Sequence, residues 1–180
     1  MEQMKTLPID LQNFEKLRED GYLYIDKTEL IYKMIKGGTY YFLSRPRRFG
    51  KSLLMSTIHA VFDGKRELFD GLAIADKADM DWAKYPVLHL DLNTNKYDAK
   101  EVLEKKIDES LCQWENEYDC SRKDLPFGMR FENVIQRAYD KTGMGVVILV
   151  DEYDKPMLQA IGNEELQNEF RGTLKGFYGA

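Results

Sequence analysis

The sequence predicts an α/β fold, a three-layer arrangement with a mostly parallel sheet, on three observations. Predicted strands and helices alternate along the chain, as they do in proteins built from βα units. The run 145–150, Gly-Val-Val-Ile-Leu-Val, is apolar almost throughout, which is typical of a strand covered on both faces of a parallel sheet. A Gly-Lys-Ser triplet at 50–52 lies between a short apolar run and an apolar helical pattern. The 180 residues, 43% of them hydrophobic, suffice for a sizeable core.

The first predicted elements precede the triplet. Residues 22–25 form a short strand or an extended arm, and the Asp26–Glu29 stretch has the D-x-x-E form of a capping box, so a helix is expected to begin there. That helix should end at the Gly37-Gly38 pair, where a positive φ carries no Cβ penalty. Its expected inward side chains are Leu30, Ile31, Met34 and Ile35.

The remaining elements follow from apolar runs and helical spacing. Residues 40–43, Tyr-Tyr-Phe-Leu, predict a short buried strand directly before the loop that contains the triplet. After the triplet, a helix is expected with Leu53, Leu54, Ile58 and Val61 at helical spacing. Further along, we expect strands at 87–92 and 145–150 and helices at 99–118, 129–141 and 163–178.

Composition and charge limit the classes of function. The 26 basic and 31 acidic residues give a net charge of −5, which argues against a generally basic surface that coats nucleic acid but permits a local basic patch. The N-terminus lacks an apolar signal core and no run approaches the roughly 18 apolar residues of a membrane helix, so a cytoplasmic protein without membrane contact is expected. The two cysteines fit no disulfide framework and are expected to be reduced.

The stretch 44–52, Ser-Arg-Pro-Arg-Arg-Phe-Gly-Lys-Ser, predicts a phosphate-binding loop between a strand and a helix, a Walker A element. Backbone N–H groups and the positive helix end would face the phosphates, Lys51 would reach the β- and γ-phosphates, and the Ser52 hydroxyl would ligate Mg²⁺. Arg45 occupies the position where the usual motif has its first glycine. The predicted nucleotide-binding residues here are Arg45, Pro46, Arg47, Arg48, Phe49, Gly50, Lys51, Ser52 and Leu53.

Two acids directly after the apolar run, Asp151 and Glu152, predict a Walker B element. In a parallel sheet ligands bind beyond the carboxyl ends of the strands, so these acids are expected to face the same crevice as the loop. Asp151 would hold Mg²⁺, directly or through water, and Glu152 would polarise the water that attacks the γ-phosphate. We therefore assign metal binding to Ser52 and Asp151, and catalysis to Lys51 and Glu152.

Several strings of the sequence together resemble the bacterial AAA-ATPase-like family. They are Leu7-Pro8-Ile9, residues 14–18, Gly21-Tyr22, residues 24–28, the loop 44–52, and Asp151-Glu152-Tyr153-Asp154-Lys155-Pro156. The resemblance implies an ATP-binding P-loop domain in which arginine at position 45 is the family's own variant. It also implies that Asp26, Lys27 and Thr28 lie near the nucleotide, beside the base, and that a PD-(D/E)XK nuclease-like domain follows in the same protein.

The predicted sheet lacks one strand of the class. P-loop ATPases of this class place a strand that carries a γ-phosphate-sensing polar residue between the loop strand and the Walker B strand, and only three strong core strands are predicted here. An empty slot would leave two unpaired inner edges, which favours aggregation. We therefore expect the chain to be the N-terminal part of a longer protein, or another segment to fill the slot. The expected organisation is an arm and helix at 1–38 packed on an ATPase core at 39–180.

The predicted function is an ATP-binding module, with Mg²⁺-dependent hydrolysis in the full-length protein. One alternative is a regulatory nucleotide switch without appreciable turnover. Another is a nucleic-acid-binding module that uses the arginines at 45, 47 and 48. The residues alone leave ATP and GTP as alternatives, as they do the oligomeric state; the expected partners are the nucleotide, the C-terminal remainder of the same protein and nucleic acid.

Overall fold

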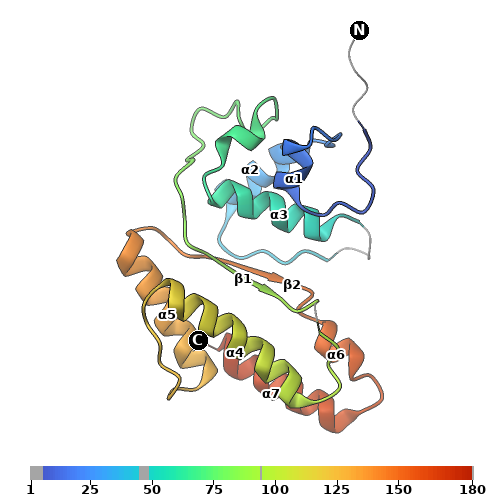
Figure 1. Ribbon diagram of the computed structural model, residues 1–180, viewed down its shortest axis with the longest axis vertical. Helices are drawn as coiled ribbons and strands as arrows, with labels where there is room; N and C mark the ends of the chain where they lie inside the picture. Colours follow the sequence, from blue (N-terminus) through green and yellow to red (C-terminus); the bar gives the residue numbers. More distant parts are fainter. Residues whose placement is uncertain (1–5, 45–48, 94, 180) are drawn as a thin grey trace. The chain divides into compact units, whose positions relative to one another are not determined.

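The computed structural model describes residues 6–44, 49–93 and 95–179, and its helices and parallel strands confirm the α/β class (Figure 1). The chain divides into two compact units, Met1–Tyr85 and Pro86–Ala180. The first contains α1 (Phe14–Glu19), α2 (Thr28–Gly37), α3 (Lys51–Phe62) and the 3-10 helix η1 (Arg66–Phe69). The second contains β1 (Val87–Asp91), α4 (Lys100–Glu117), α5 (Phe127–Thr142), β2 (Val147–Asp151), α6 (Lys155–Gln159) and α7 (Glu164–Tyr178).

The sheet of the second unit consists, within the described ranges, of β1 and β2 side by side in parallel. The register pairs Val87 with Val147 and ends with Asp91 opposite Asp151. The chain between them runs through α4 and α5, as a parallel pair requires a crossover connection. The strands predicted at 87–92 and 145–150 are thus confirmed, with boundaries shifted by one or two residues.

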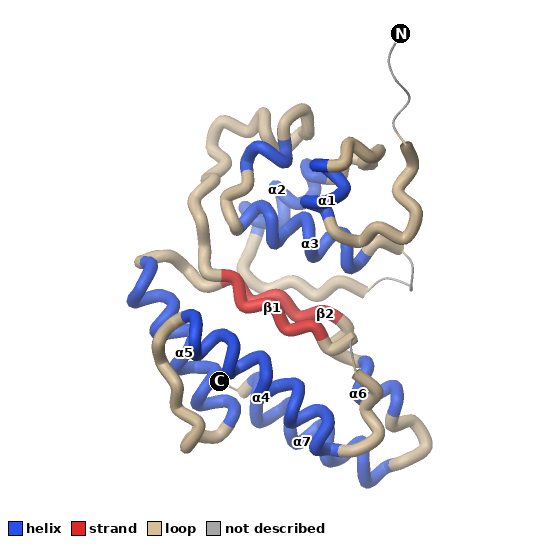
Figure 2. Tube along the Cα trace, viewed as in Figure 1, coloured by secondary structure: helices blue, strands red, loops and turns tan. Residues whose placement is uncertain are grey.

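The core of the second unit lies between one face of this sheet and the helices α4, α5 and α7 (Figure 2). Leu88 and Leu90 point from β1 into that core and are 0% and 1% exposed. Phe131 of α5 stacks on Phe177 of α7, with ring centroids 4.6 Å apart. Full burial of such a side chain stabilises by about 1.5–3 kcal/mol, so this apolar layer holds the three helices on the sheet.

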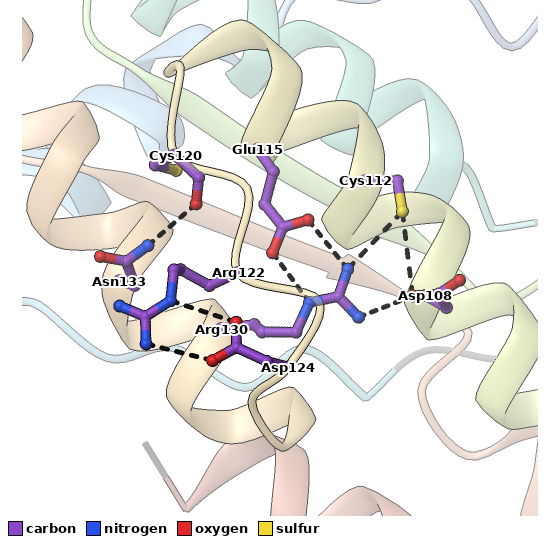
Figure 3. A network of polar contacts seen from close by, with 8 residues as sticks. All are labelled: Asp108, Cys112, Glu115, Cys120, Arg122, Asp124, Arg130 and Asn133. Atoms are coloured by element: carbon purple, nitrogen blue, oxygen red, sulfur yellow. Dashed lines mark hydrogen bonds and ion pairs between the residues drawn. The ribbon is translucent and has the colours of Figure 1, made fainter.

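A buried ion pair joins α4 to α5 inside the same unit (Figure 3). The Arg130 guanidinium donates to both carboxylate oxygens of Glu115, at 2.8 and 2.9 Å, and from Nη1 to Asp108 at 2.6 Å. Arg130 and Glu115 have side chains only 3% and 1% exposed. The hydrogen bonds to Glu115 raise the pKa of the Arg130 guanidinium although burial opposes its charge, so the arginine stays protonated.

In the first unit, aromatic side chains pack α1 against η1. Phe14 of α1 is fully buried, and its ring lies 4.8 Å from Phe69, which in turn lies 5.1 Å from Trp82. Arg18 donates from Nε to the Leu68 carbonyl and from Nη2 to the Asp70 carbonyl, both at 2.7 Å. These contacts fix α1 against η1 and the loop that follows it.

The structure corrects several expectations about the first unit. Residues 40–43 form no strand in the described chain, and Tyr40 is 95% exposed. Aromatic residues favour strands only where a neighbouring strand accepts their backbone hydrogen bonds. Leu30, expected to point inward, is 59% exposed, whereas Ile31 on the same helix is buried. Gly38 has φ 175°, which is extended backbone and not the left-handed cap that was expected.

The glycines at the end of α2 lie close to the side chain of Tyr41. The Tyr41 hydroxyl donates to the Met34 carbonyl at 2.5 Å, which places its ring over the helix end. A Cβ at Gly38 would lie 3.1 Å from that hydroxyl and a Cβ at Gly37 3.3 Å from it. A side chain at either position would therefore require the exposed Tyr41 side chain to shift by a few tenths of an ångström.

Ile148 is 44% exposed, so the expectation that β2 is covered on both faces is wrong at this position; β2 is an edge strand of the described sheet. None of the helices in the described ranges has the length and apolarity needed to span a bilayer.

We expect Arg130→Met to lower the free energy of unfolding by about 3–5 kcal/mol, because it leaves the Glu115 carboxylate buried without a partner. Urea unfolding followed by circular dichroism measures this. Arg122→Met is the matched control, since Arg122 pairs with Asp124 on the surface at 3.2 Å and should change stability little. Equal effects of the two substitutions would contradict a structural role for the buried pair.

Candidate functional site

The N-terminus of α3 has the features of an anion-binding helix end. Gly50 is the N-cap with φ 73°, in the left-handed region, and the helix continues for 12 residues from Lys51. Among the described residues no side chain caps this end, and its first turn contains no acid. An α-helix leaves its first N–H groups without intrahelical acceptors and carries a partial positive charge there, so this end suits a phosphate.

Gly50 is required by its backbone conformation. No described atom lies within 4 Å of the position that a Cβ would occupy at this residue, so space alone would admit a larger side chain. The left-handed conformation costs other residues roughly 1–2 kcal/mol, which glycine avoids. Glycine at position 50 therefore allows the left-handed turn that leads into α3.

The body of α3 is anchored to the core of the first unit. The Phe14 N–H donates to the Ser56 hydroxyl at 2.9 Å, and Thr57 and Ile58 are buried. The predicted inward residues Leu53 and Leu54, nearer the helix start, are only partly buried. The helix is therefore held firmly beyond its first turn, while its N-terminal residues keep access to solvent.

The structure gives Asp26 and Thr28, which the family resemblance places near the nucleotide, a structural role at the start of α2. Asp26 Oδ1 accepts from the Thr28 N–H at 2.8 Å and from the Thr28 hydroxyl at 2.7 Å. Asp26 Oδ2 accepts from the Ala73 N–H at 2.8 Å, and the fully buried Thr28 hydroxyl accepts from the Ile74 N–H at 3.0 Å. Together they fasten residues 73–74 to the helix. Lys27, between Asp26 and Thr28, is exposed.

The charge state of Asp26 follows from these bonds. Partial burial acts to raise the pKa of Asp26, but the hydrogen bonds from Ala73 and Thr28 outweigh it, and the net pKa is lowered. The carboxylate is therefore ionised at neutral pH. The start of α2 is capped by this ionised group, although Lys27 is the formal N-cap residue and the helix begins at Thr28.

In the second unit, Asp151 is the last residue of β2 and Glu152 follows it in a turn. Asp151 is 8% exposed, and its Oδ1 accepts from the Glu152 N–H at 2.9 Å. Glu152 has φ 52°, a left-handed conformation that is uncommon for a residue with a side chain. Such conformations persist where the surroundings hold them, and they occur often at functional sites.

Sequence reasoning missed two residues beside these acids, Asn93 and Lys155. Lys155 Nζ donates to the main-chain carbonyl of Asn93 and to its Oδ1, the latter at 3.2 Å. The Asn93 N–H in turn donates to Asp91 Oδ1 at 2.7 Å. The available signals were the position of Lys155 within the Asp-Glu-Tyr-Asp-Lys-Pro string and a polar residue two positions after a parallel strand.

The predicted site residues thus fall into separate groups. Residues 49–53 come together at the start of α3 and residues 26–28 at the start of α2, both in the first unit, whereas Asp151 and Glu152 lie in the second. Arg45, Pro46, Arg47 and Arg48 lie outside the described residues. Within the described ranges, no three or more His, Cys, Asp or Glu side chains form a cluster that could hold a metal ion.

The chain belongs to the AAA-ATPase-like family, described as predicted AAA-ATPases, whose sequence pattern matches residues 8–180. This assignment supports ATP binding and the P-loop NTPase class. The chain is also similar to an uncharacterized protein encoded in the vnfD 5′ region of Azotobacter chroococcum mcd 1, with 41% identity over 176 residues. The match covers 97% of this chain and 34% of that protein, so the chain spans about a third of its relative's length. No solved structure matches the chain.

We expect Asp26→Asn to lower the free energy of unfolding at pH 7 by about 1 kcal/mol, because an amide cannot accept all three hydrogen bonds. The folded-state pKa of Asp26 is lowered, so its contribution is present above about pH 4 and is lost as the pH falls through the folded value. The stability difference from wild type should therefore shrink in acid, as urea unfolding at several pH values would measure. Asp98→Asn, at a surface residue paired with Lys96, is the control.

Proposed function

We propose that this chain binds Mg²⁺-ATP with the triphosphate at the N-terminus of α3. One observation carries the proposal, the left-handed Gly50 that leads into a helix end with no described side-chain cap and no acid in its first turn. Membership of a family of predicted AAA-ATPases supports a nucleotide as the anion. The basic residues at 45, 47 and 48 add positive charge to the same stretch of sequence.

In this proposal the loop residues bind the phosphates. The N–H groups of the first turn of α3 donate to phosphate oxygens, and the Lys51 ammonium neutralises charge on the β- and γ-phosphates. The Ser52 hydroxyl supplies an oxygen ligand for Mg²⁺. Asp26, Lys27 and Thr28 are proposed to act beside the base, with Asp26 and Thr28 held by their bonds to residues 73–74.

Asp151 is proposed to bind the metal ion, and Glu152 is proposed to position the attacking water. A carboxylate oxygen suits Mg²⁺, which retains several waters and takes most of its other ligands from substrate phosphates. Asp151 holds the ion directly or through water, and Glu152 orients the attacking water as a general base. Because the chain spans a third of its relative's length, hydrolysis is proposed for the longer protein, together with a nuclease-like domain that follows and a role for nucleic acid as partner.

ATP should stabilise the wild-type chain against thermal unfolding, and Lys51→Ala should weaken ATP binding about 10- to 100-fold through loss of a charge-assisted contact. At 100 times Kd the ligand adds about 2.7 kcal/mol of stability, which a thermal-shift titration detects. Isothermal titration with Mg²⁺-ATP and Mg²⁺-GTP then measures the affinities and the base preference.

Lys33→Ala is the matched control for this experiment. Lys33 lies in the same unit and pairs with Glu29 on the surface of α2 at 3.5 Å, so its loss should leave ATP affinity unchanged. Equal ATP affinity of Lys51→Ala and wild type would contradict the proposed phosphate site. Binding of single-stranded DNA that survives excess ATP, with a steep salt dependence, would favour the nucleic-acid-binding alternative.

In the longer protein, Glu152→Gln should slow single-turnover ATP hydrolysis by about 10²- to 10⁴-fold while ATP binding persists, because it removes the general base. Rapid quench with radiolabelled ATP measures the rate, and Glu132→Gln, at an exposed position of α5, is the control. A slow rate that is the same in Glu152→Gln and wild type would favour the nucleotide switch without turnover.

A further inference from the structure

Lys155 connects the carboxyl ends of the two strands in the second unit. Its ammonium donates to the main-chain carbonyl and to Oδ1 of Asn93, a residue two positions beyond the end of β1. Lys155 itself begins α6, four residues beyond the end of β2. We call this set of bonds between Lys155 and Asn93 the strand-end tie.

The strand-end tie links the segments that follow the two strands, beyond the last hydrogen bond of the ladder. The Leu92 N–H still donates to the Asp151 carbonyl at 3.1 Å, and beyond that point the two strands lead into different loops. The Lys155 side chain bridges those loops where the backbone ladder has ended. It therefore constrains the loop that carries the acids relative to the rigid end of β1.

The same residue also holds the turn at Glu152 through its main chain. The Lys155 N–H donates to the Glu152 carbonyl at 3.0 Å, and the Glu152 N–H donates to Asp151 Oδ1 at 2.9 Å. Glu152 sits between these bonds with φ 52°. A left-handed residue with a side chain relaxes to a commoner conformation unless its neighbours prevent it, so Lys155 lies where it can maintain the turn.

We propose that Lys155 is a positioning residue for Glu152, an inference that rests on the proposed hydrolysis. Its ammonium is occupied by Asn93, so it acts through the geometry of the Asp151–Glu152 turn and not by contact with the phosphates. A general base must lie within hydrogen-bond reach of the attacking water, and a displacement of about 1 Å can lower a rate about 100-fold. The tie keeps the carboxylate of Glu152 in that range.

The test compares Lys155→Met with Lys155→Arg and Lys141→Met. Lys155→Met removes the ammonium at similar side-chain length, and Lys155→Arg restores donors toward Asn93. Lys141→Met is the matched control, because Lys141 likewise donates to a main-chain carbonyl and a side-chain oxygen, those of Glu117 at 2.9 Å and Asp119 at 3.0 Å.

The first readout needs no nucleotide. Hydrogen exchange of the Glu152 and Lys155 amides, followed by NMR, should become about 10-fold faster in Lys155→Met, stay near wild type in Lys155→Arg and remain unchanged in Lys141→Met. Unchanged exchange in Lys155→Met would overturn the proposal whatever the outcome with ATP.

The second readout separates positioning from general damage. In the longer protein, Lys155→Met should lower the single-turnover rate of ATP hydrolysis about 10- to 100-fold while the Kd for ATP stays within twofold of wild type, and Lys155→Arg should recover most of that rate. A wild-type rate in Lys155→Met, with Glu152→Gln inactive, overturns the positioning role and leaves the proposed function standing. Absence of ATP binding by wild type overturns the proposed function and the catalytic part of this inference together, and the exchange data then show only whether the tie holds the turn.

Discussion

The parallel ladder between β1 and β2 is the constraint on which the second unit depends. Its register places Leu88 and Leu90 toward the helices and brings Asp91 opposite Asp151 at the carboxyl end. The helices α4, α5 and α7 cover the leucine face, and the Arg130–Glu115 pair fixes α4 to α5 within that layer. A shift of one residue in the register would turn the leucines away from the core and move the acids from the sheet end, so packing and site geometry select the same register.

In the first unit, the candidate site depends on how α3 is held. Its middle is held by the hydrogen bond from Phe14 to Ser56 and by the buried residues Thr57 and Ile58. Its first turn is only partly buried and begins from a left-handed glycine. An anion site needs a firmly held helix with an accessible first turn. Donors held by a rigid helix bind an anion without the entropic cost of ordering them, whereas a buried helix end would be closed to a ligand.

Much of this fold could be predicted from the sequence, since helices and buried strands leave periodic patterns. The helices at 100–117, 127–142 and 164–178 and both strands were expected within a few residues. The strand expected at 40–43 is absent from the described chain. Its aromatic residues have a tendency to form a strand, but a strand also needs a neighbouring strand as its hydrogen-bonding partner, which these residues do not specify. The bond from Lys155 to Asn93 spans 62 positions and leaves no periodic signal, so only the structure could reveal it.

The two groups of candidate site residues are therefore specified in different ways. At the start of α3 the determinants are local, because one left-handed glycine and the absence of acid in the first turn suffice to make a helix end attractive to phosphate. At the end of β2 they are tertiary, because Glu152 lies between bonds to its neighbours and Lys155 is bonded to Asn93, two residues beyond β1. A phosphate-binding end that forms locally tolerates change in the surrounding fold. A residue that positions water does not tolerate such change, because its geometry depends on the loops that hold it. On the proposed role of Lys155, substitutions within the strand-end tie should thus affect the chemical step before they affect binding.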